Sequence, residues 1–277
     1  MNKTELLKRA VNIRKGILTA VYQAKSGHPG GSLSAADLYT YLYFEELNID
    51  PEKPDKKDRD RFVLSKGHTA PGYYSALANR GFFPVEDLKT LRHTGSYLQG
   101  HPDMKHIPGV DMSSGSLGQG ISAAVGMAVS AKMFQEDYRV YTLVGDGELQ
   151  EGQVWEAAML AGFRKLDNLV VIVDNNNLQI DGRIDEVNSP YPIDKKFEAF
   201  NFHVITIDGH NFDEIDAAFK EAKKVKGMPT AIIAETVKGK GVSFMENRAG
   251  WHGKAPNKEE FEQAVYEIEK AGEAYAV

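Results

Sequence analysis

The sequence contains no cysteine. This absence excludes a disulfide framework, a zinc site built from thiolates and a cysteine nucleophile. No stretch approaches the roughly 18 consecutive apolar residues that a membrane-spanning helix needs, so we expect no membrane partner. The first ten residues lack the apolar centre of a secretory signal. Together these absences predict a cytoplasmic protein.

An excess of positive charge is also missing. Lysine and arginine total 33 against 39 aspartates and glutamates, for a formal net charge of −6. A net acidic chain is poorly suited to nucleic acid, and we expect no such partner. Hydrophobic residues make up 42% of the 277 residues, which is enough for a full core. That length allows one or two domains. Because no linker is visible, we expect a single domain over residues 1–277.

Apolar residues recur at helical spacing in the first part of the chain. The series from Leu6 to Val21 predicts an amphipathic helix. The segment 26–31 is rich in glycine and proline, and we expect it to be irregular. A second helix is expected to follow, with Ser34 as its N-cap. The mixed charges from Asp50 to Arg61 predict a solvent-exposed loop.

The rest of the chain alternates short apolar runs with helical patterns. The runs are rich in valine and isoleucine and apolar on both faces, as buried parallel strands are. They span residues 62–65, 140–144, 169–173, 203–207 and 230–234. Helices are predicted over 117–134, 153–165, 212–226 and 258–271. This alternation predicts an α/β fold, with a parallel sheet flanked by helices.

Oxygen-bearing side chains follow two of these predicted strands. Asp146 stands between two glycines after one strand, and Asn176 follows the next strand thirty residues later. That separation is about one strand–helix–strand crossover, so both should face the ligand-binding edge of the sheet. Carboxylate and amide oxygens suit Mg²⁺ or Ca²⁺, and Mg²⁺ also takes phosphate oxygens. The glycines leave room for a diphosphate, so the pair predicts a metal–diphosphate site.

This pattern resembles the fingerprint of thiamine diphosphate enzymes. The segment 145–157, Gly-Asp-Gly-Glu-Leu-Gln-Glu-Gly-Gln-Val-Trp-Glu-Ala, is similar to transketolases in particular. Further motifs follow the order of that family: Ser26-Gly27-His28-Pro29-Gly30, Ser65-Lys66-Gly67-His68, Gly100-His101-Pro102, Gly115-Ser116-Leu117-Gly118-Gln119-Gly120, Asp208-Gly209-His210, and His252-Gly253 with Ala255-Pro256. The resemblance implies the thiamine diphosphate-binding fold and, within it, the domain that holds the diphosphate.

The same resemblance implies which residues hold the cofactor. Asp146, Asn176 and the backbone carbonyl of Leu178 are expected to bind the Mg²⁺ that clamps the diphosphate. The expected contacts to thiamine diphosphate come from His68, Gly115, Ser116, Leu117, Gly147, Asn176 and His252. Ser116 departs from the family pattern, which usually has proline at that position.

Histidine suits sugar chemistry near neutral pH, because its pKa is about 6.5 when unperturbed. The chain has eight histidines, and several adjoin a glycine. By resemblance, His28, His101 and His252 are expected to be catalytic and to line the cleft around the reacting carbons of the donor sugar. His252 is expected to serve cofactor and substrate alike.

Four other histidines receive no catalytic role. His210 ends a predicted strand in a turn and is expected to be structural. His203 begins a strand pattern and is expected to pack. For His93 and His106 the sequence indicates only solvent-exposed loops.

Two further features leave alternatives open. Glu151 and Glu156 could complement the dipole of the helix on which they lie, or, as the resemblance implies, lie at a subunit interface. The basic segment 238–241 could approach a phosphate or form a mobile loop over the site.

The extent of the resemblance implies a partner. Transketolases complete the cofactor site with a glutamate from a pyrimidine-binding domain, whereas this chain resembles only the diphosphate-binding part. The pyrimidine-binding and C-terminal domains are then expected in another chain. We therefore expect the N-terminal subunit of a split transketolase, active only with a C-terminal subunit in an α2β2 assembly. Its substrates would be sugar phosphates, between which it transfers a two-carbon ketol unit.

Two other interpretations stay open. The chain could be half of another thiamine diphosphate enzyme, such as a 2-oxo acid dehydrogenase or a deoxyxylulose phosphate synthase. Both share the metal motif, but the segments 26–30 and 155–157 favour transketolase. It could also be a non-catalytic cofactor-binding module, although binding alone would not need histidines that face a sugar.

Overall fold

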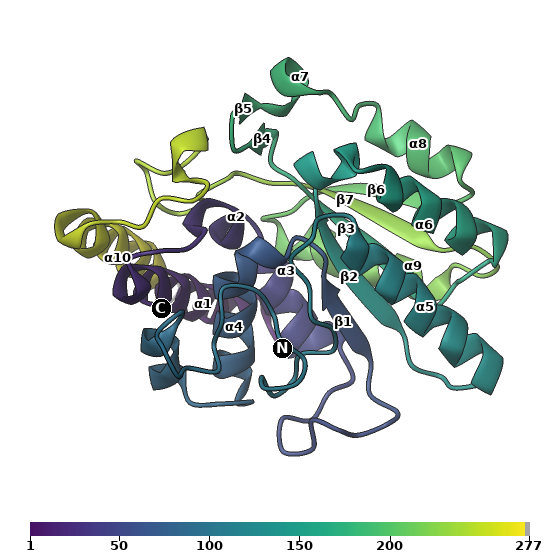
Figure 1. Cartoon of the computed structure of the whole chain (residues 1–277), viewed down its shortest axis with the longest axis horizontal. Coiled ribbons are helices and arrows are strands. Elements are labelled where there is room, and N and C mark those ends of the chain that lie inside the picture. Colours follow the sequence, from purple (N-terminus) through teal and green to yellow (C-terminus); the bar gives the residue numbers. More distant parts are fainter. Residues whose placement is uncertain (275–277) are drawn as a thin grey trace.

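The computed structural model describes residues 1–274 and contains one central parallel sheet (Figure 1). Its five strands lie in the order β1-β2-β3-β7-β6, and every neighbouring pair is parallel. The strands are β1 (Arg61–Leu64), β2 (Val140–Gly145), β3 (Leu169–Asn175), β6 (His203–Asp208) and β7 (Thr230–Glu235). A separate antiparallel hairpin joins β4 (Leu178–Gln179) to β5 (Gly182–Arg183). All five predicted strands are confirmed.

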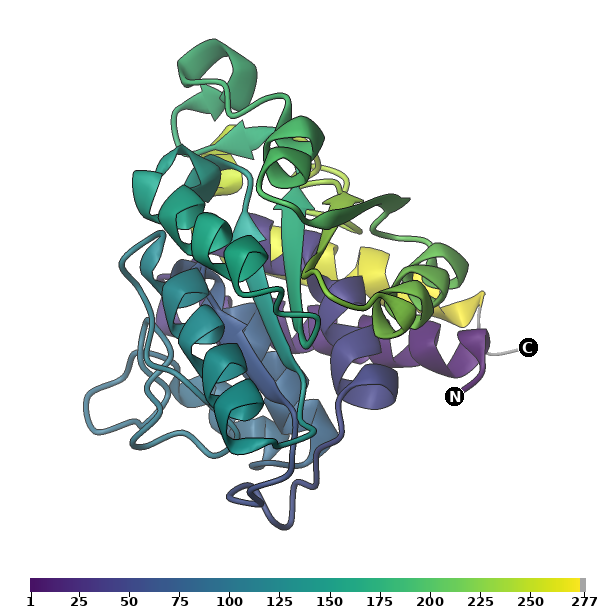
Figure 2. The same cartoon turned by 90° about the vertical axis from the view of Figure 1, so that its right-hand side faces the viewer.

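Helices cover both faces of this sheet, as the sequence predicts. One face carries α5 (Gln119–Phe134), α6 (Gly152–Phe163) and α8 (Ile193–Ala199), with the first two side by side (Figure 2). The other carries α1 (Lys3–Ala24), α3 (Ala36–Tyr41), α4 (Ala70–Arg80), α9 (Phe212–Lys224) and α10 (Lys258–Glu273). The shorter elements are α2 (Pro29–Ser34), α7 (Ile184–Val187) and the turns η1 (Leu42–Glu46), η2 (Gly67–Thr69), η3 (Val85–Thr90), η4 (Gly147–Gln150) and η5 (Ala249–Trp251). No helix in the described range has the length and apolar character to cross a membrane.

Alternation along the central strands produces two separate cores. On β3, Val170 and Ile172 pack with the α1 side, whereas Val171 and Val173 pack with the α5 side. Every residue of β3 is buried. A strand buried on both faces reads as a continuous apolar run, which is why the sequence pattern locates it well.

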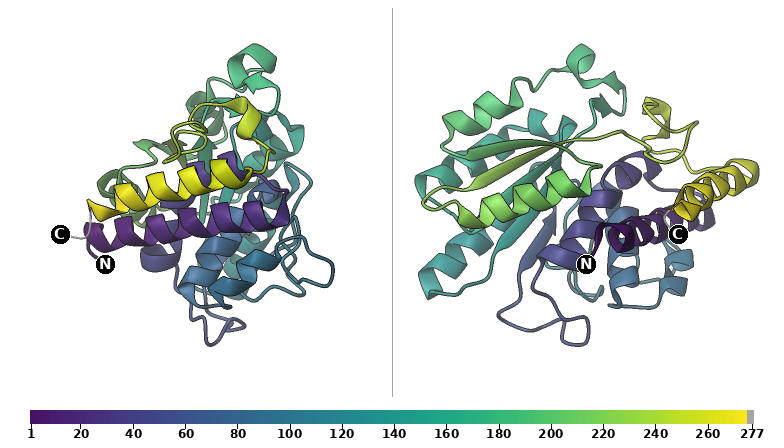
Figure 3. Two further views of the ribbon diagram at one scale, coloured as in Figure 1. Left: turned by 90° about the vertical axis from the view of Figure 1, so that its left-hand side faces the viewer. Right: turned by 180° about the vertical axis from the view of Figure 1, so that it is seen from behind.

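The first and last helices pack against each other. α10 lies along α1 (Figure 3), and the rings of Tyr22 and Phe261 stack with their centroids 4.3 Å apart. Each helix begins with a capping box, formed by Asn2 with Glu5 on α1 and by the corresponding asparagine and glutamate on α10. Such boxes satisfy backbone N–H groups that lack partners inside the helix.

The helix boundaries near the second motif differ from the prediction. The segment expected to be irregular is partly helical, because α2 begins at Pro29, a residue well suited to the first turn of a helix. Ser34 is the last residue of α2 and caps no helix; its hydroxyl donates to the carbonyl of Gly31 and to Asp174. α4, α8 and the β4–β5 hairpin were not predicted.

The contact between α6 and α8 gives a test of this packing. A methyl group added to Gly162 on α6 would lie 1.8 Å from the carbonyl oxygen of Phe200. We expect Gly162→Ala to lower the free energy of unfolding by about 1–3 kcal/mol through overpacking. Gly126→Ala on α5, where a methyl group meets nothing within 4 Å, should instead raise it by about 0.5–1 kcal/mol. Urea unfolding compares the two, and equal effects would contradict this packing.

Candidate active site

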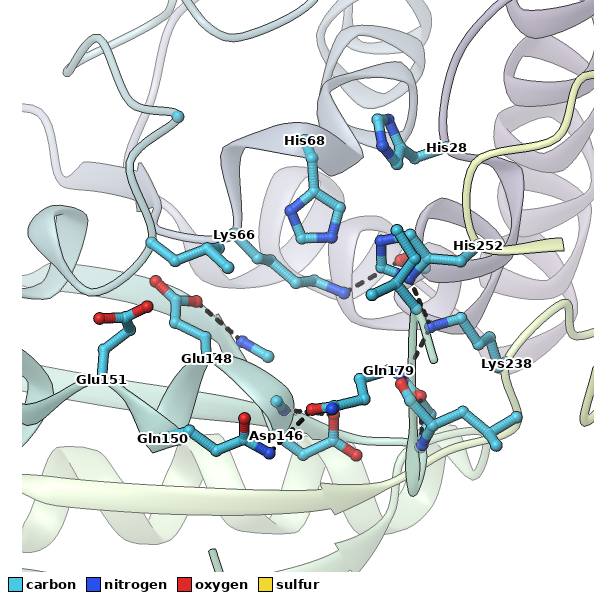
Figure 4. Close-up of a pocket in the computed structure, with 18 residues that line it drawn as sticks. His28, Lys66, His68, Asp146, Glu148, Gln150, Glu151, Gln179, Lys238 and His252 are labelled. Carbon is cyan, nitrogen blue, oxygen red and sulfur yellow. Dashed lines mark hydrogen bonds between the residues drawn. The ribbon is translucent and has the colours of Figure 1, made fainter. Parts of the chain in front are cut away.

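A cavity of about 430 Å³ opens at the carboxyl edge of the sheet. Its walls come from the segments that follow β1, β2, β3 and β7, together with the loops around His28 and Gly115. The edge of a parallel sheet collects these segments because all its strands point the same way. Figure 4 shows His28, His68 and His252 along one wall and Asp146 and Glu148 opposite.

The three expected metal ligands line this cavity together. The Asp146 carboxylate accepts hydrogen bonds from the backbone N–H groups of Gly147, at 2.8 Å, and Asn177, at 2.6 Å. The Asn176 amide oxygen accepts from the Leu178 N–H at 3.2 Å. The Leu178 carbonyl accepts from the Lys238 ammonium at 2.9 Å, so a cation already lies against it.

Asp174, at the end of β3, supports this group from behind. It is fully buried and accepts hydrogen bonds from Ser34, at 2.6 Å, Asn176 Nδ2, at 3.2 Å, and Thr236. Lys66 pairs with it as well. Burial opposes its ionisation, but Lys66 and these hydrogen bonds hold the pKa of Asp174 below its usual value. Because the Asn176 Nδ2 donates to Asp174, its Oδ1 is the atom that would bind a metal ion.

Burial disfavours the charged forms of two groups at the cavity. Burial, and then the charge of Asp174, raise the pKa of Asp146 to about 7. Burial lowers the pKa of Lys238 to about 8, although Asp146 favours its charged form. A buried carboxylate needs a cation, and buried ammonium groups need an anion. A magnesium–diphosphate pair supplies both, so the residues fit that group.

The types of ligand atom at the cavity also suit Mg²⁺. Within the described residues, no three histidine, aspartate or glutamate side chains gather as a metal-binding cluster. The candidate set contains one carboxylate, one amide oxygen and one backbone carbonyl. Mg²⁺ is usually bound by few protein ligands and completes its shell with phosphate oxygens and water.

Three histidines form a tight cluster at the cavity wall. The ring centroids of His28, His68 and His252 lie 5.1, 5.4 and 5.2 Å apart. Burial, and then Arg92, lower the pKa of His28 to about 4; burial and Lys238 lower that of His252 to about 3. Burial lowers the pKa of His68 as well. The three rings are therefore neutral at pH 7. The His28 Nδ1 is buried without a hydrogen-bond partner in residues 1–274.

Of the remaining predicted residues, some line the cavity and others do not. Gly115 and Leu117 line it, whereas His101 and Ser116 are exposed and do not. The His101 ring instead packs against Gly115, where an added Cβ would lie 3.0 Å from it. Gly115 has φ +154, a conformation that favours glycine.

Sequence reasoning missed Lys66, Asp174 and the supporting role of Glu148. The buried Glu148 accepts hydrogen bonds from Ser65 Oγ at 2.5 Å, Gly118 N–H at 2.9 Å and Gly145 N–H at 3.0 Å. It therefore joins the segments that follow β1 and β2 to the Gly115–Gly120 loop. A detectable signal existed, because each of the three charged residues lies within a few positions of a strand end.

The other histidines lie outside the cavity. His210 contacts Asp37 and the backbone of Val237, in keeping with a structural role. His203 contacts Glu221 and is partly exposed rather than packed in the core. The remaining two, His93 and His106, are exposed.

The structure also shows where Glu151, Glu156 and the basic segment 238–241 lie relative to the cavity. Glu151 lines the cavity, and both it and Glu156 are exposed. Lys238 is buried with its ammonium at the cavity, which favours the phosphate-facing interpretation of the segment 238–241.

Comparisons with known proteins agree with this geometry. Residues 7–270 match the family model described as "Transketolase, thiamine diphosphate binding domain". The 6-deoxy-6-sulfo-D-fructose transketolase subunit SqwG of Clostridium sp. (strain MSTE9) is 47% identical, over 97% of this chain and 98% of the relative. A subunit of the apulose-4-phosphate transketolase of Phocaeicola vulgatus is 44% identical, over 92% of this chain and 90% of the relative.

A solved structure shows the same fold. The transketolase of Campylobacter jejuni superimposes with a TM-score of 0.89 at 34% identity, over 100% of this chain but only 48% of that chain. The architecture, the motif order and these matches lead to one conclusion. The chain belongs to the transketolase family and carries its thiamine diphosphate-binding domain.

Proposed function

We propose that this chain is the N-terminal subunit of a split, magnesium- and thiamine diphosphate-dependent transketolase. With a separate C-terminal subunit, it would transfer a two-carbon ketol unit from a ketose phosphate to an aldose phosphate. The observation that carries the proposal is one cavity lined by Asp146, Asn176, the Leu178 carbonyl and neutral histidines. The absence of a membrane-spanning helix from the described residues is compatible with a cytoplasmic enzyme.

The residues divide the work of holding the cofactor. Asp146, Asn176 and Leu178 would bind Mg²⁺, while Lys238 and the Gly147 backbone would face the diphosphate. When bound, thiamine diphosphate would supply a nucleophilic thiazolium carbon for reaction with the ketose carbonyl. Gly115 and Leu117 would lie against its aminopyrimidine ring and His68 near its diphosphate, as three lining residues of the same cavity.

The neutral histidines would bind the hydroxyl groups of the sugar and exchange protons with them. A neutral imidazole can accept a proton from a hydroxyl and return it, or bind a hydroxyl at its N–H. His28 lines the cavity, and the His252 Nδ1 lies 3.0 Å from the Lys238 ammonium. His101 is exposed next to Gly115 and would meet the more distant part of the donor.

Two observations support a separate partner chain. The chain spans nearly the whole length of two relatives that are named as subunits, but about half of the single-chain enzyme. In addition, α6 exposes an apolar stripe, Met159, Leu160 and Phe163, with exposed fractions of 60%, 44% and 76%. Helical spacing places Glu156 on the same face. Exposed apolar patches of this kind mark protein interfaces, and an α2β2 assembly would cover this stripe.

The metal site is tested by Asp146→Asn. Removal of the charge should weaken magnesium-dependent binding of thiamine diphosphate by more than about 100-fold, as measured by calorimetry on the assembled enzyme. Asp213→Asn, at an exposed position on α9, is the control and should bind normally. Unchanged affinity in Asp146→Asn would refute the metal assignment.

The partner is tested by reconstitution with a chain that carries a transketolase pyrimidine-binding domain. Ketol transfer is expected only in the mixture. Phe163→Glu should abolish the assembly in size-exclusion chromatography, because it buries a charge at the interface. Tyr266→Glu is the matched control, since Tyr266 is also an exposed aromatic residue, 61% exposed on α10. Full activity of the isolated chain would sink the proposal.

The neutrality of the histidines predicts a pH dependence of stability. A histidine whose folded pKa lies below the unfolded value of about 6.5 binds more protons when unfolded. Stability is therefore complete above pH 6.5 and falls as the pH drops toward 4, the pKa of His28. Asp146, whose pKa is raised to about 7, titrates in the same range with the opposite sign in both proteins, so the test compares the wild type with His28→Gln. Between pH 7 and 5 the urea midpoint of the wild type should decrease relative to that of the variant. An identical slope in the variant would show that His28 is not neutralised by burial.

A further inference from the structure

The turn after β7 delivers Lys238 to the cavity. Its ammonium donates to the Leu178 carbonyl at 2.9 Å and lies 3.0 Å from the His252 Nδ1. The side chain is almost completely buried. A lysine has four side-chain torsions, so its position at the cavity depends on how firmly the Val237–Lys240 turn is held.

His210 holds the start of this turn. Its Nε2 accepts a hydrogen bond from the Val237 N–H at 2.9 Å. Because a backbone N–H can only donate, this nitrogen carries no proton. The proton of the neutral ring is then on Nδ1, which donates to Asp37 Oδ2 at 2.7 Å. The two contacts thus fix the tautomer and the orientation of the imidazole.

Arg14 holds the end of the same turn. Its Nε donates to the Lys240 carbonyl at 3.3 Å, while its two terminal nitrogens bind Asp37 at 2.9 and 2.6 Å. Burial alone would raise the pKa of Asp37, but Arg14 and His210 hold it well below its usual range. The backbone of the turn is also bonded to Gly30 and Asn247, but the two side chains that hold it are both oriented by one buried carboxylate on α3. Bidentate arginine–carboxylate pairs are among the most rigid polar contacts in proteins.

We propose that Arg14, Asp37 and His210 form a positioning unit that holds Lys238 toward the cofactor diphosphate. His210 is a positioning residue, because it acts through the backbone of Val237 and does not line the cavity. The unit couples the interface of α1 and α3 to the chemistry at the sheet edge. The diphosphate part rests on the proposed function, whereas the placement of Lys238 does not.

Two substitutions of His210 separate the contacts. An asparagine can retain the donor to Asp37 but does not reach the Val237 N–H. A glutamine places its carbonyl oxygen near the former Nε2 and can accept from Val237. Both variants are small, polar and similar in hydrogen-bonding capacity, so a general loss of stability would affect them alike.

The first measurement needs no ligand. The apo chain is labelled with an amine-reactive acetylating reagent at one pH, and Lys238 and Lys66 are quantified by mass spectrometry. We expect His210→Asn to raise the labelling of Lys238 several-fold while Lys66, buried against Asp174, stays protected. His210→Gln should resemble the wild type. Equal labelling in the two variants, or a parallel rise at Lys66, would overturn the positioning role.

The second measurement uses inorganic pyrophosphate with Mg²⁺ on the assembled enzyme. His210→Asn should weaken binding by about tenfold, the cost of one hydrogen bond. The same substitution in a Lys238→Met background should cost less than about twofold, because the group that it positions is gone. Equal losses in both backgrounds would overturn the coupling to Lys238. If the wild type binds no pyrophosphate, the proposed function and this coupling fail, while the labelling result still decides the placement.

Discussion

The buried carboxylate of Asp174 is the interaction on which the site depends. It lies at the end of β3 and binds Lys66 after β1, Ser34 on α2 and Thr236 after β7, while also fixing the amide of Asn176. Four segments that are distant in sequence thus meet at one charge. An unpaired buried carboxylate would be strongly unfavourable, so every partner is needed. Removal of any one of these partners would therefore leave the buried Asp174 carboxylate with an interaction missing.

The parallel sheet explains why such a centre forms at this edge and carries excess charge. The carboxyl ends of β1, β2, β3 and β7 meet there, and each is followed by a polar segment. Lys66 forms an ion pair with Asp174. Asp146 and Lys238 form no such pair in the described chain. Burial raises the pKa of Asp146 and lowers that of Lys238, so it favours the uncharged form of each. This is the electrostatic state expected of a site built for a divalent cation and a polyanion together.

Much of this architecture can be predicted from the sequence, and the failures have physical causes. The strands can be located because a strand buried on both faces has a continuous run of apolar residues. Asp146 and Asn176 can then be identified because they come directly after two of these runs. Asp174 and Glu148 are missed because an acidic residue near a turn is usually exposed, and only the fold shows that theirs are buried and fully bonded. Ser34 is misassigned as a cap because its hydroxyl serves Asp174, a tertiary contact that overrides local preference. The placement of His101 outside the cavity likewise depends on loop packing.

The position of α6 connects the cofactor site to assembly. Its N-terminal end adjoins Glu151 at the cavity, and its exposed apolar stripe lies toward Phe163 at the other end of the helix. A partner that packs on this stripe and extends along α6 toward Glu151 would also approach the cavity mouth. Burial of the stripe and enclosure of the cofactor would then be one event, so each would strengthen the other by linkage.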